Sequence, residues 1–263
     1  MFICAVFLFL LFLLSNISNS LSESSSDQNL LRILITPNRF ETKINQTASN
    51  IIVIDKKDIE NSNTNSLSEL LNAQVGITSN NQGGVGQTSS YFIQGFEKKY
   101  ISILIDGVSF ADNTATQSET YLNSISLEEI ERIEILKGPQ GAIYGSSAAG
   151  GVISIITKGN NKKGMNNSFS SRFGSFGTVS SNINTGYSAD KWSVNLSING
   201  THSDGFSAKN TDEEEENDSF NSVKTALKFS LKNDNDLKFF STFRQTDNKI
   251  QYDNAFTTND FNK

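Results

Sequence analysis

An acidic run at residues 210–218 is the densest group of side chains that could bind a ligand. It reads Asn-Thr-Asp-Glu-Glu-Glu-Glu-Asn-Asp, and Tyr252 and Asp253 place more oxygen atoms further along the chain. Clustered carboxylate and carbonyl oxygens are the ligands that Ca²⁺ prefers, although the spacing of an EF-hand is absent. A solvated acidic loop accounts for the same residues, so a calcium site and a plain surface loop both stay open.

A second candidate is the polar loop at residues 79–90, Ser-Asn-Asn-Gln-Gly-Gly-Val-Gly-Gln-Thr-Ser-Ser. Glycines among amides and hydroxyls let a backbone approach a polar ligand closely. A surface linker has the same composition. Residues 109–121 form another polar loop of this kind.

Composition and motifs argue against an enzyme and against nucleic-acid binding. The 263 residues carry a net charge of -6, so the chain lacks a basic footprint. The one cysteine, Cys4, lies in an apolar leader, and the lone His202 stands beside Ser203 and Asp204. The glycine-containing segment 138–145 lacks the Lys-Ser/Thr pair of a phosphate-binding loop. We therefore expect a non-enzyme without cofactors, calcium being the one exception under consideration.

Strands that alternate with short helices predict a small mixed α/β domain over residues 38–158. Asp55 can cap a short helix over 56–60, and Ser66 with Glu69 forms a capping box before a second. The capping box Ser126-Leu127-Glu128-Glu129 predicts a third helix. Residues 51–54, 91–96 and 101–108 read as strands, with Asp106-Gly107 as a turn.

Residues 132–157 read as a strand, a set of tight glycine turns and a second strand. Gly138-Pro139 ends the first strand, and the run 152–156 is short and apolar enough for a buried strand. Glycine turns of this kind also occur in ordinary α/β domains.

Beyond residue 158 apolar and polar residues alternate in segments of about ten residues, as in transmembrane β-barrels. Trp192, Val194, Leu196 and Ile198 alternate with polar residues, and 223–231 repeats the pattern. A soluble antiparallel sheet alternates too. The preceding domain favours about five strands of a barrel over 159–263, with apolar side chains toward lipid.

The N-terminus reads as an export signal. Residues 2–14 are an apolar run of 13, shorter than the ~20 residues of a spanning helix. Small residues near Ser20 suit cleavage, so we expect a signal peptide over 1–20. An uncleaved anchor is the alternative. Residues 21–37 are then a flexible segment with a short β-prone island, which is either the first strand of the domain or a segment that adds to a partner's sheet.

The glycine-rich string and several others resemble TonB-dependent outer-membrane receptors, most closely the cobalamin receptor branch. The resemblance spans about residues 31–255. It implies an α+β plug domain, a small mixed sheet with short helices, followed by antiparallel strands of an incomplete transmembrane β-barrel. The strings that carry it are Asn38-Arg39-Phe40-Glu41, Gln87-Thr88-Ser89-Ser90, Leu104-Ile105-Asp106-Gly107-Val108, Gly138-Pro139, Tyr144-Gly145-Ser146 and Ala149-Gly150-Gly151-Val152.

The resemblance also implies partners, cargo and site residues. Receptors of this family take up a scarce large nutrient across the outer membrane, driven by the periplasmic protein TonB. The implied TonB box is Leu31, Arg32, Ile33, Leu34, Ile35 and Thr36. The implied substrate contacts are Gln82, Gln87, Ser89, Ser90, Asp112 and Asn113. The implied calcium ligands are Glu216, Asp218, Tyr252 and Asp253.

The implied plug–barrel lock consists of Gln94, Lys137 and Glu134. The family usually has arginine at the first position and often at the second. Gln94 cannot reproduce a charged bidentate bond, and Lys137 makes it only as a point charge. The sequence therefore predicts a weaker lock or one that is built differently.

The length of the chain and the resemblance lead to two further expectations, about completeness and about cargo. A barrel of about 22 strands needs well over 200 residues at ~10 residues per strand, so we expect part of a longer receptor or a truncated gene product. Cobalamin is the expected cargo, with a ferric siderophore as the alternative. An alternative of another class is a secreted or surface β-rich binding protein without transport.

Overall fold

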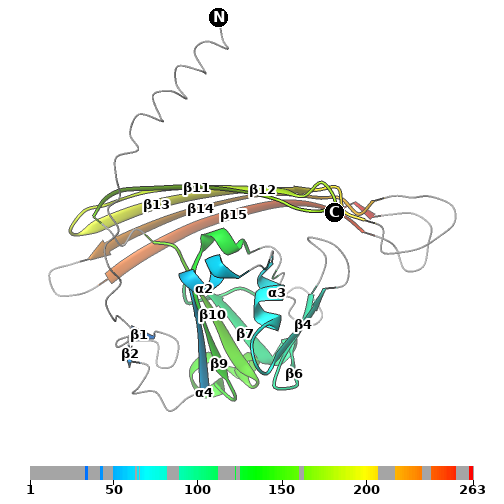
Figure 1. Ribbon diagram of the computed structural model, residues 1–263. Helices are drawn as coiled ribbons and strands as arrows, with labels where there is room; N and C mark the ends of the chain where they lie inside the picture. The colour runs from blue at the N-terminus through cyan, green and yellow to red at the C-terminus, as the bar shows by residue number, and fades with distance from the viewer. Residues whose placement is uncertain are drawn as a thin grey trace, which may run out of the picture.

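The structure is a computed structural model with two parts, a small mixed domain and a wide curved sheet that lies over it (Figure 1). It describes residues 50–62, 64, 66–81, 89–111, 122, 125–159, 163–206, 217–232 and 238–252, and the short strands 33–34, 42–43 and 261–262. Within this part of the chain, no helix combines the length and apolar character that a membrane span needs. The predicted signal peptide lies outside the described residues.

A five-stranded mixed sheet is the centre of the N-terminal domain. Its strand order is β3-β9-β10-β7-β8. The β7–β10 pair is parallel and the other pairs are antiparallel. All five side chains of β7 are buried, as expected for a strand covered on both faces. The strands are β3 Asn50–Asp55, β7 Ile101–Ile105, β8 Val108–Ser109, β9 Ile130–Lys137 and β10 Gly151–Thr157.

Two short helices begin where the sequence places their caps. Helix α2 (Lys56–Asn61) starts with a capping box, in which the Asp58 backbone N–H donates to Asp55 Oδ1 at 3.2 Å. Helix α3 (Leu67–Asn72) is capped by Ser66 Oγ, which accepts from the Glu69 N–H at 3.2 Å. Both predicted helices are confirmed, and α3 buries leucines against the sheet.

Replacing Asp55 by alanine should destabilise the domain by about 0.5–2 kcal/mol, because helix α2 loses its N-cap acceptor. The measurement is the urea midpoint of unfolding. Lys57→Ala, an exposed change in the same helix, is the control and should leave the midpoint nearly unchanged. Equal midpoints for both variants would mean that the cap contributes little here.

The third predicted helix is wrong. Ser126 and Glu129 do form the capping box, but only the 3-10 turn η4 (Leu127–Glu129) follows. The chain enters β9 at Ile130, and β9 pairs with β3 on one side and β10 on the other. Two flanking strands supply more hydrogen bonds and burial than a few turns of helix would, so tertiary pairing overrides the local signal.

A smaller antiparallel sheet lies beside the mixed sheet. It joins β4 (Ile77–Asn81), β5 (Ser89–Ile93) and β6 (Phe96–Glu97). Strand β5 therefore stops short of the predicted end at residue 96, and a turn at Gln94-Gly95 starts β6. The remaining short elements are η2 Lys98–Tyr100, α4 Gly141–Tyr144, η5 Ser146–Ala148 and the pair β1 Ile33–Leu34 and β2 Thr42–Lys43.

The hydrophobic core occupies both faces of the mixed sheet. Alternate residues of β9 point to opposite sides, so Ile133 and Ile135 join the main cluster with α3 while Leu136 joins a smaller one. The smaller cluster adds Val152 and Leu104 from the neighbouring strands. This arrangement fixes the end of β10, from which the chain passes to the large sheet.

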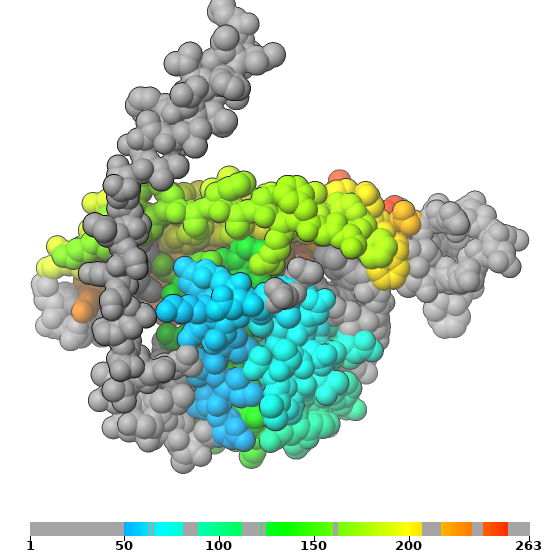
Figure 2. Space-filling view, in the orientation of Figure 1, coloured from blue at the N-terminus to red at the C-terminus, as the bar shows by residue number. Residues whose placement is uncertain are grey.

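The large sheet, here called the wall sheet, runs in chain order from β11 to β16. Figure 2 shows it lying directly on the N-terminal domain. Its strands are β11 Gly164–Phe173, β12 Val179–Ser188, β13 Trp192–Ser203, β14 Phe220–Lys232, β15 Lys238–Tyr252 and β16 Phe261–Asn262. The sequence predicted about five strands, and the structure adds only the two-residue β16.

The two faces of the wall sheet have opposite polarity. The outer face carries most of the exposed apolar side chains of the wall sheet, including Phe169, Ile183 and Leu227. The inner face is mostly polar, and on the middle strands β12 to β14 its side chains are buried against the N-terminal domain, including Asn182 and Lys224. This inverts the burial of a water-soluble sheet and confirms the predicted alternation.

Candidate functional site

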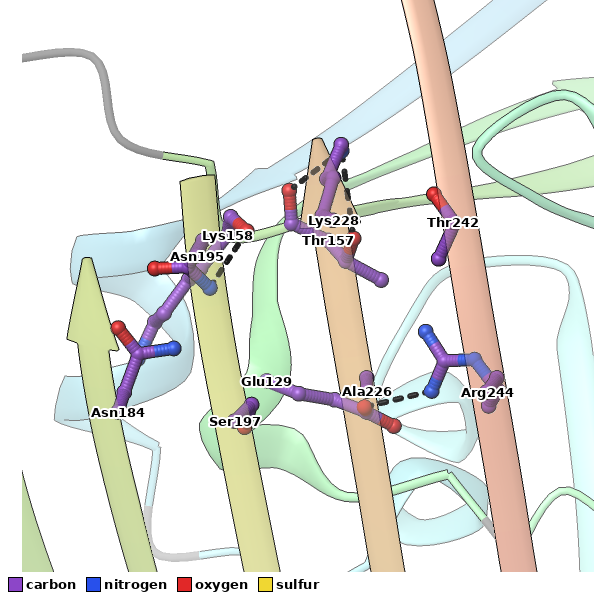
Figure 3. Close-up of a pocket in the computed structure, with 10 residues that line it drawn as sticks. All are labelled: Glu129, Thr157, Lys158, Asn184, Asn195, Ser197, Ala226, Lys228, Thr242 and Arg244. Carbon is purple, nitrogen blue, oxygen red and sulfur yellow. Dashed lines mark hydrogen bonds and ion pairs between the residues drawn. The ribbon is translucent and has the colours of Figure 1, made fainter. Parts of the chain in front are cut away.

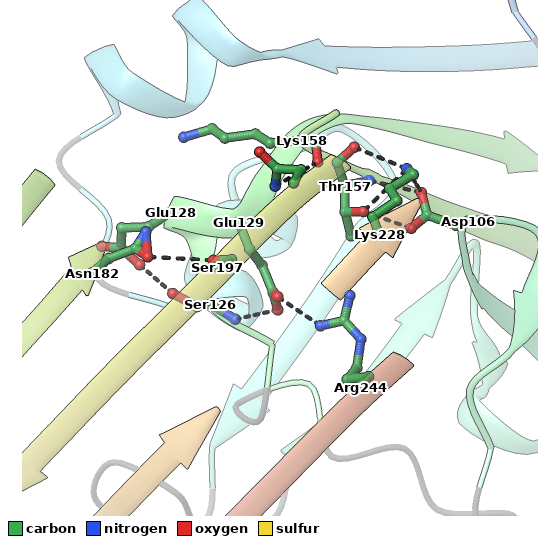
Figure 4. A network of polar contacts seen from close by, with 11 residues as sticks. Asp106, Ser126, Glu128, Glu129, Thr157, Lys158, Asn182, Ser197, Lys228 and Arg244 are labelled. Atoms are coloured by element: carbon green, nitrogen blue, oxygen red, sulfur yellow. Dashed lines mark hydrogen bonds and ion pairs between the residues drawn. The ribbon is translucent and has the colours of Figure 1, made fainter. Parts of the chain in front are cut away.

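The inner face of the wall sheet meets the N-terminal domain through ion pairs and hydrogen bonds (Figure 4). The domain contributes carboxylates from η4 and from the turn after β7. The wall contributes cations from β11, β14 and β15. The contacts lie close together in space although their partners are more than 100 residues apart in some pairs.

Glu129 and Arg244 form the tightest of these contacts. Arg244 Nη1 lies 2.6 Å from Glu129 Oε2, and both side chains are largely buried. The other oxygen of Glu129, Oε1, accepts from the Ser126 backbone N–H at 3.2 Å. The capping box thus orients the carboxylate toward the wall, and charge assistance strengthens the bond to arginine.

Asp106 joins the end of β10 to β14. Its Oδ1 accepts from Lys228 Nζ at 3.0 Å and from the Thr157 backbone N–H at 3.0 Å, while Oδ2 accepts from the Thr157 hydroxyl at 2.5 Å. Asp106 and Gly107 have positive φ angles of 49° and 83°, as both central residues of a type I′ hairpin turn do. The turn that the sequence predicts at Asp106-Gly107 therefore also carries a contact to the wall.

Glu128 makes the third ion pair. Its Oε1 lies 3.0 Å from Arg172 Nη1 on the edge strand β11, and Ser126 Oγ donates to its other oxygen. Arg172 is 42% exposed, so solvent screens this pair more than the other two. Together the three pairs connect the domain to β11, β14 and β15.

A small cavity between the domain and the wall is lined by the residues of this network (Figure 3). Asn184 Nδ2 and Arg244 Nη2 are buried there without a hydrogen-bond partner among the described residues. The Lys158 backbone carbonyl accepts from Asn195 Nδ2 at 3.5 Å. Burial lowers the pKa of the Lys158 ammonium, and the nearby Lys56 charge acts in the same direction. The interface is therefore polar and rich in cations.

The predicted lock residues lie within the N-terminal domain. Glu134 is fully buried and accepts from Arg132 Nε at 2.8 Å. Lys137 Nζ donates to the Val75 carbonyl at 3.2 Å, and Gln94 is exposed beside the same turn. The structure thus brings Gln94 and Lys137 together, and Glu134 lies elsewhere on β9. Their role in a lock stays a prediction.

Of the six predicted substrate contacts, only Ser89 and Ser90 are described. Both lie at the start of β5, where they pair with Asn81 and Asn80 of β4, and Ser89 is buried. The others lie outside the described residues: Gln82, Gln87, Asp112 and Asn113.

The predicted calcium ligands are described only in part. Asp218 is buried, with 4% exposure, just before β14. Tyr252 ends β15, and its side chain is outside the described part, as are Glu216 and Asp253. The described residues hold no group of three or more His, Cys, Asp or Glu side chains that could bind a metal. Buried Asp218 suits an oxygen ligand, and calcium binding stays a prediction.

Part of the predicted TonB box is described at the backbone level. Ile33 and Leu34 form β1, which pairs antiparallel with Lys43 and Thr42 of β2. Leu31, Arg32, Ile35 and Thr36 lie outside the described residues. A β-strand conformation fits both predicted interpretations, the first strand of the domain and a segment that adds to a partner's sheet, so the TonB box stays a prediction.

Comparison with known proteins gives the family. The model of the TonB-dependent receptor plug domain matches residues 43–152, from β2 to the start of β10. The chain belongs to the TonB-dependent receptor family. Its N-terminal domain is the plug, and the wall sheet is an open set of antiparallel strands that follows it.

Curated relatives and a solved structure agree with this assignment. The Vitamin B12 transporter BtuB of Vibrio cholerae serotype O1 is 32% identical over 233 residues, 87% of this chain and 38% of that protein. BtuB of Vibrio vulnificus strain YJ016 is 41% identical over 125 residues, 48% of this chain and 20% of that protein. The receptor chain therefore spans well under half the length of these relatives.

The pyoverdine outer membrane receptor FpvA from Pseudomonas aeruginosa PAO1 has the same fold. It superposes with a TM-score of 0.66 at 16% identity, over 83% of this chain and 30% of that chain. At this identity the likeness concerns the fold alone.

Sequence reasoning missed the residues that join the receptor's plug to its wall. Arg172, Lys228 and Arg244 are cations at inward positions of β11, β14 and β15. Apart from Lys224 and the lysines at the strand ends, the other inward residues of these strands are uncharged. A charge on the polar face of an alternating strand is the signal that could have found them. Asp106, Glu128 and Glu129 carried no such signal, because turns and caps already account for them.

Proposed function

We propose that this chain forms the plug and the first wall strands of an outer-membrane receptor for energised uptake of a large, scarce nutrient. The observation that carries the proposal is the polar contact between plug and wall. Ion pairs and hydrogen bonds that water can replace allow two parts to separate and rejoin, unlike a continuous apolar core. TonB, pulling on residues 31–36, would move the plug and admit the cargo.

The outer face of the wall sheet supports contact with outer-membrane lipid. Exposed apolar side chains cover it, and aromatic pairs lie at both ends of β12. Tyr187 and Trp192 have ring centroids 5.3 Å apart at one end, and Phe176 and Phe206 are 5.0 Å apart at the other. Barrel proteins place aromatic rings at the two membrane interfaces in this manner.

Cobalamin is the proposed cargo, because two relatives at 32% and 41% identity are vitamin B12 transporters. The test is binding of labelled cyanocobalamin to outer membranes that contain the receptor, compared with membranes that lack it. Saturable binding only where the receptor is present is the expected result. Equal binding to both membranes would remove cobalamin from the proposal.

A ferric siderophore is the second candidate, because the sequence resemblance to TonB-dependent receptors leaves it open beside cobalamin. The same membranes should be offered labelled ferric pyoverdine and, separately, labelled cyanocobalamin. Saturable binding of the chelate, with no saturable binding of the vitamin, would select the siderophore.

Deletion of residues 31–36 should abolish energised uptake and leave surface binding intact, because the segment contacts TonB and not the cargo. A deletion of equal length within the polar stretch 21–28 is the control and should affect neither. Uptake and binding are measured on the same cells. Loss of both together would favour a structural segment in a binding protein without transport.

If the acidic loop binds calcium, chelation should weaken cargo binding and Asp218→Ala should mimic that loss. The loss of one carboxylate weakens a calcium site, because affinity for the ion depends on the number and charge of its oxygen ligands. Asp190→Ala, an exposed acidic residue at the opposite end of the wall, is the matched control. If neither calcium chelation nor Asp218→Ala changes the affinity for the cargo, the acidic run is a solvated loop.

A further inference from the structure

Four successive rows of inward-facing residues cross the wall sheet, and each row carries one cation. The register from β11 to β15 defines the rows. They are Arg172-Ser180-Thr201-Ser222-Asn248, Ser170-Asn182-Asn199-Lys224-Thr246, Ser168-Asn184-Ser197-Ala226-Arg244 and Asn166-Gly186-Asn195-Lys228-Thr242. We call Arg172, Lys224, Arg244 and Lys228 the cation ladder.

The ladder has one sign of charge. No other residue in the four rows is ionisable, so the inner face carries positive charge without an acidic side chain of its own over this stretch. Adjacent rows are two residues apart along each strand, or roughly 7 Å, so the ladder extends about 20 Å along the strands. The polar residues between the cations are amides and hydroxyls, which also bind anions.

Three cations of the ladder form direct ion pairs with the plug, and Lys224 does not. Arg172, Arg244 and Lys228 pair with Glu128, Glu129 and Asp106. Lys224 is only 7% exposed, and among the described residues its ammonium makes no hydrogen bond or ion pair, although the charges of Glu129 and Glu128 act on it from a longer distance.

Three buried polar atoms without a partner among the described residues lie within one row of Lys224: two donors and the acceptor Asn248 Oδ1. Ser222 Oγ, two residues earlier on the same strand, and Arg244 Nη2, one row along on β15, are both buried without a partner among the described residues. A buried cation next to unused donors is unfavourable unless an anion reaches it. The chemistry of this cluster therefore matches a carboxylate or phosphate group.

We propose that Lys224 and the cation ladder bind anionic groups of the cargo along the wall, which makes carboxylate- or phosphate-bearing molecules the preferred cargo. The inference rests on the proposed transport function. Arg172 lies nearest the β11–β12 turn and Lys228 nearest the β12–β13 turn, so a cargo anion passes from rung to rung as the plug carboxylates withdraw. A surface of one charge sign raises the local concentration of the opposite ion.

The test measures the electrostatic potential beside Lys224 in the receptor as it sits in the outer membrane. Thr201→Cys places a thiol one row from Lys224 on the neighbouring strand, at a partly exposed position. Cys4, in the predicted leader, is the sole other cysteine of the sequence. The thiol is modified with an anionic sulfonatoethyl or a cationic trimethylammonioethyl methanethiosulfonate, and the two rates are compared.

The anionic reagent should react faster, and Lys224→Gln should lower the anionic-to-cationic rate ratio by about threefold or more. Lys249→Gln removes the same charge from the outer face of β15 and should leave the ratio unchanged. Lys224→Arg keeps the charge and should keep the ratio, which separates loss of charge from loss of folding. A ratio near one in the parent receptor, or a ratio that Lys224→Gln does not change, would contradict anion binding by the cation ladder.

Cargo uptake measured on the same cells separates this inference from the proposed function. A high ratio that depends on Lys224, in cells without energised uptake, would leave the anion site standing and remove the transport role. Normal uptake together with a ratio near one would leave the transport role standing and remove the anion site.

Discussion

Replacing Arg244 by methionine should lower the stability of the docked plug by about 3–5 kcal/mol, because Glu129 is left charged and buried without its partner. The Glu129 side chain is only 6% exposed, and the pair is the tightest of the three. The measurement is the urea concentration at which a protease gains access to the plug in receptor-containing membranes. Lower urea should suffice for the variant.

A second substitution tests the cause of that loss. Adding Glu129→Gln to Arg244→Met removes the stranded charge and should recover most of the stability, because a neutral amide costs far less to bury. Lys249→Met, an exposed change on the outer face of the same strand, is the control. If the double variant is as unstable as the single one, packing of the arginine side chain and not its charge holds the plug.

Replacing Gly151 by alanine should destabilise the plug by about 3 kcal/mol or more, because a β-carbon there meets backbone on a paired strand. Gly151 has φ of 152°, and an added Cβ would lie 2.5 Å from the Leu136 carbonyl oxygen. Its neighbours in the sheet are Lys137 on one side and Ile101 on the other. Neither strand can move away without breaking its own ladder.

The matched control is Gly200→Ala in β13, where an added Cβ has no heavy atom within 4 Å. This change should stay within about 0.5 kcal/mol of the parent. Thermal unfolding of both variants gives the comparison. Equal melting temperatures would mean that β10 shifts to accommodate the methyl group.

The Gly151→Ala and Arg244→Met variants disturb different parts of the structure. Gly151→Ala disturbs the interior of the plug, whereas Arg244→Met loosens a correctly folded plug from the wall. Hydrogen exchange distinguishes them, because the first should raise exchange in β9 and β10 and the second mainly at η4 and the turn after β7. The plug must survive as a folded unit for the proposed gating, so the second class is the functionally informative one.

The sequence by itself determined the local elements of this protein. Caps at Asp55 and Ser66 depend on hydrogen bonds to residues three positions away, and the alternation in β13 and β14 depends on neighbours two apart. Such signals depend only on residues a few positions apart. The strings that resemble receptors of this family likewise predicted the plug and the strands that follow it.

Only the tertiary structure decided which charges meet. The predicted helix after Ser126 became one 3-10 turn because β9 is paired on both sides. The contacts between Glu129 and Arg244 and between Asp106 and Lys228 join residues 115 and 122 positions apart. No local pattern encodes such a distance, because the partners are set by sheet register and by how the wall lies on the plug.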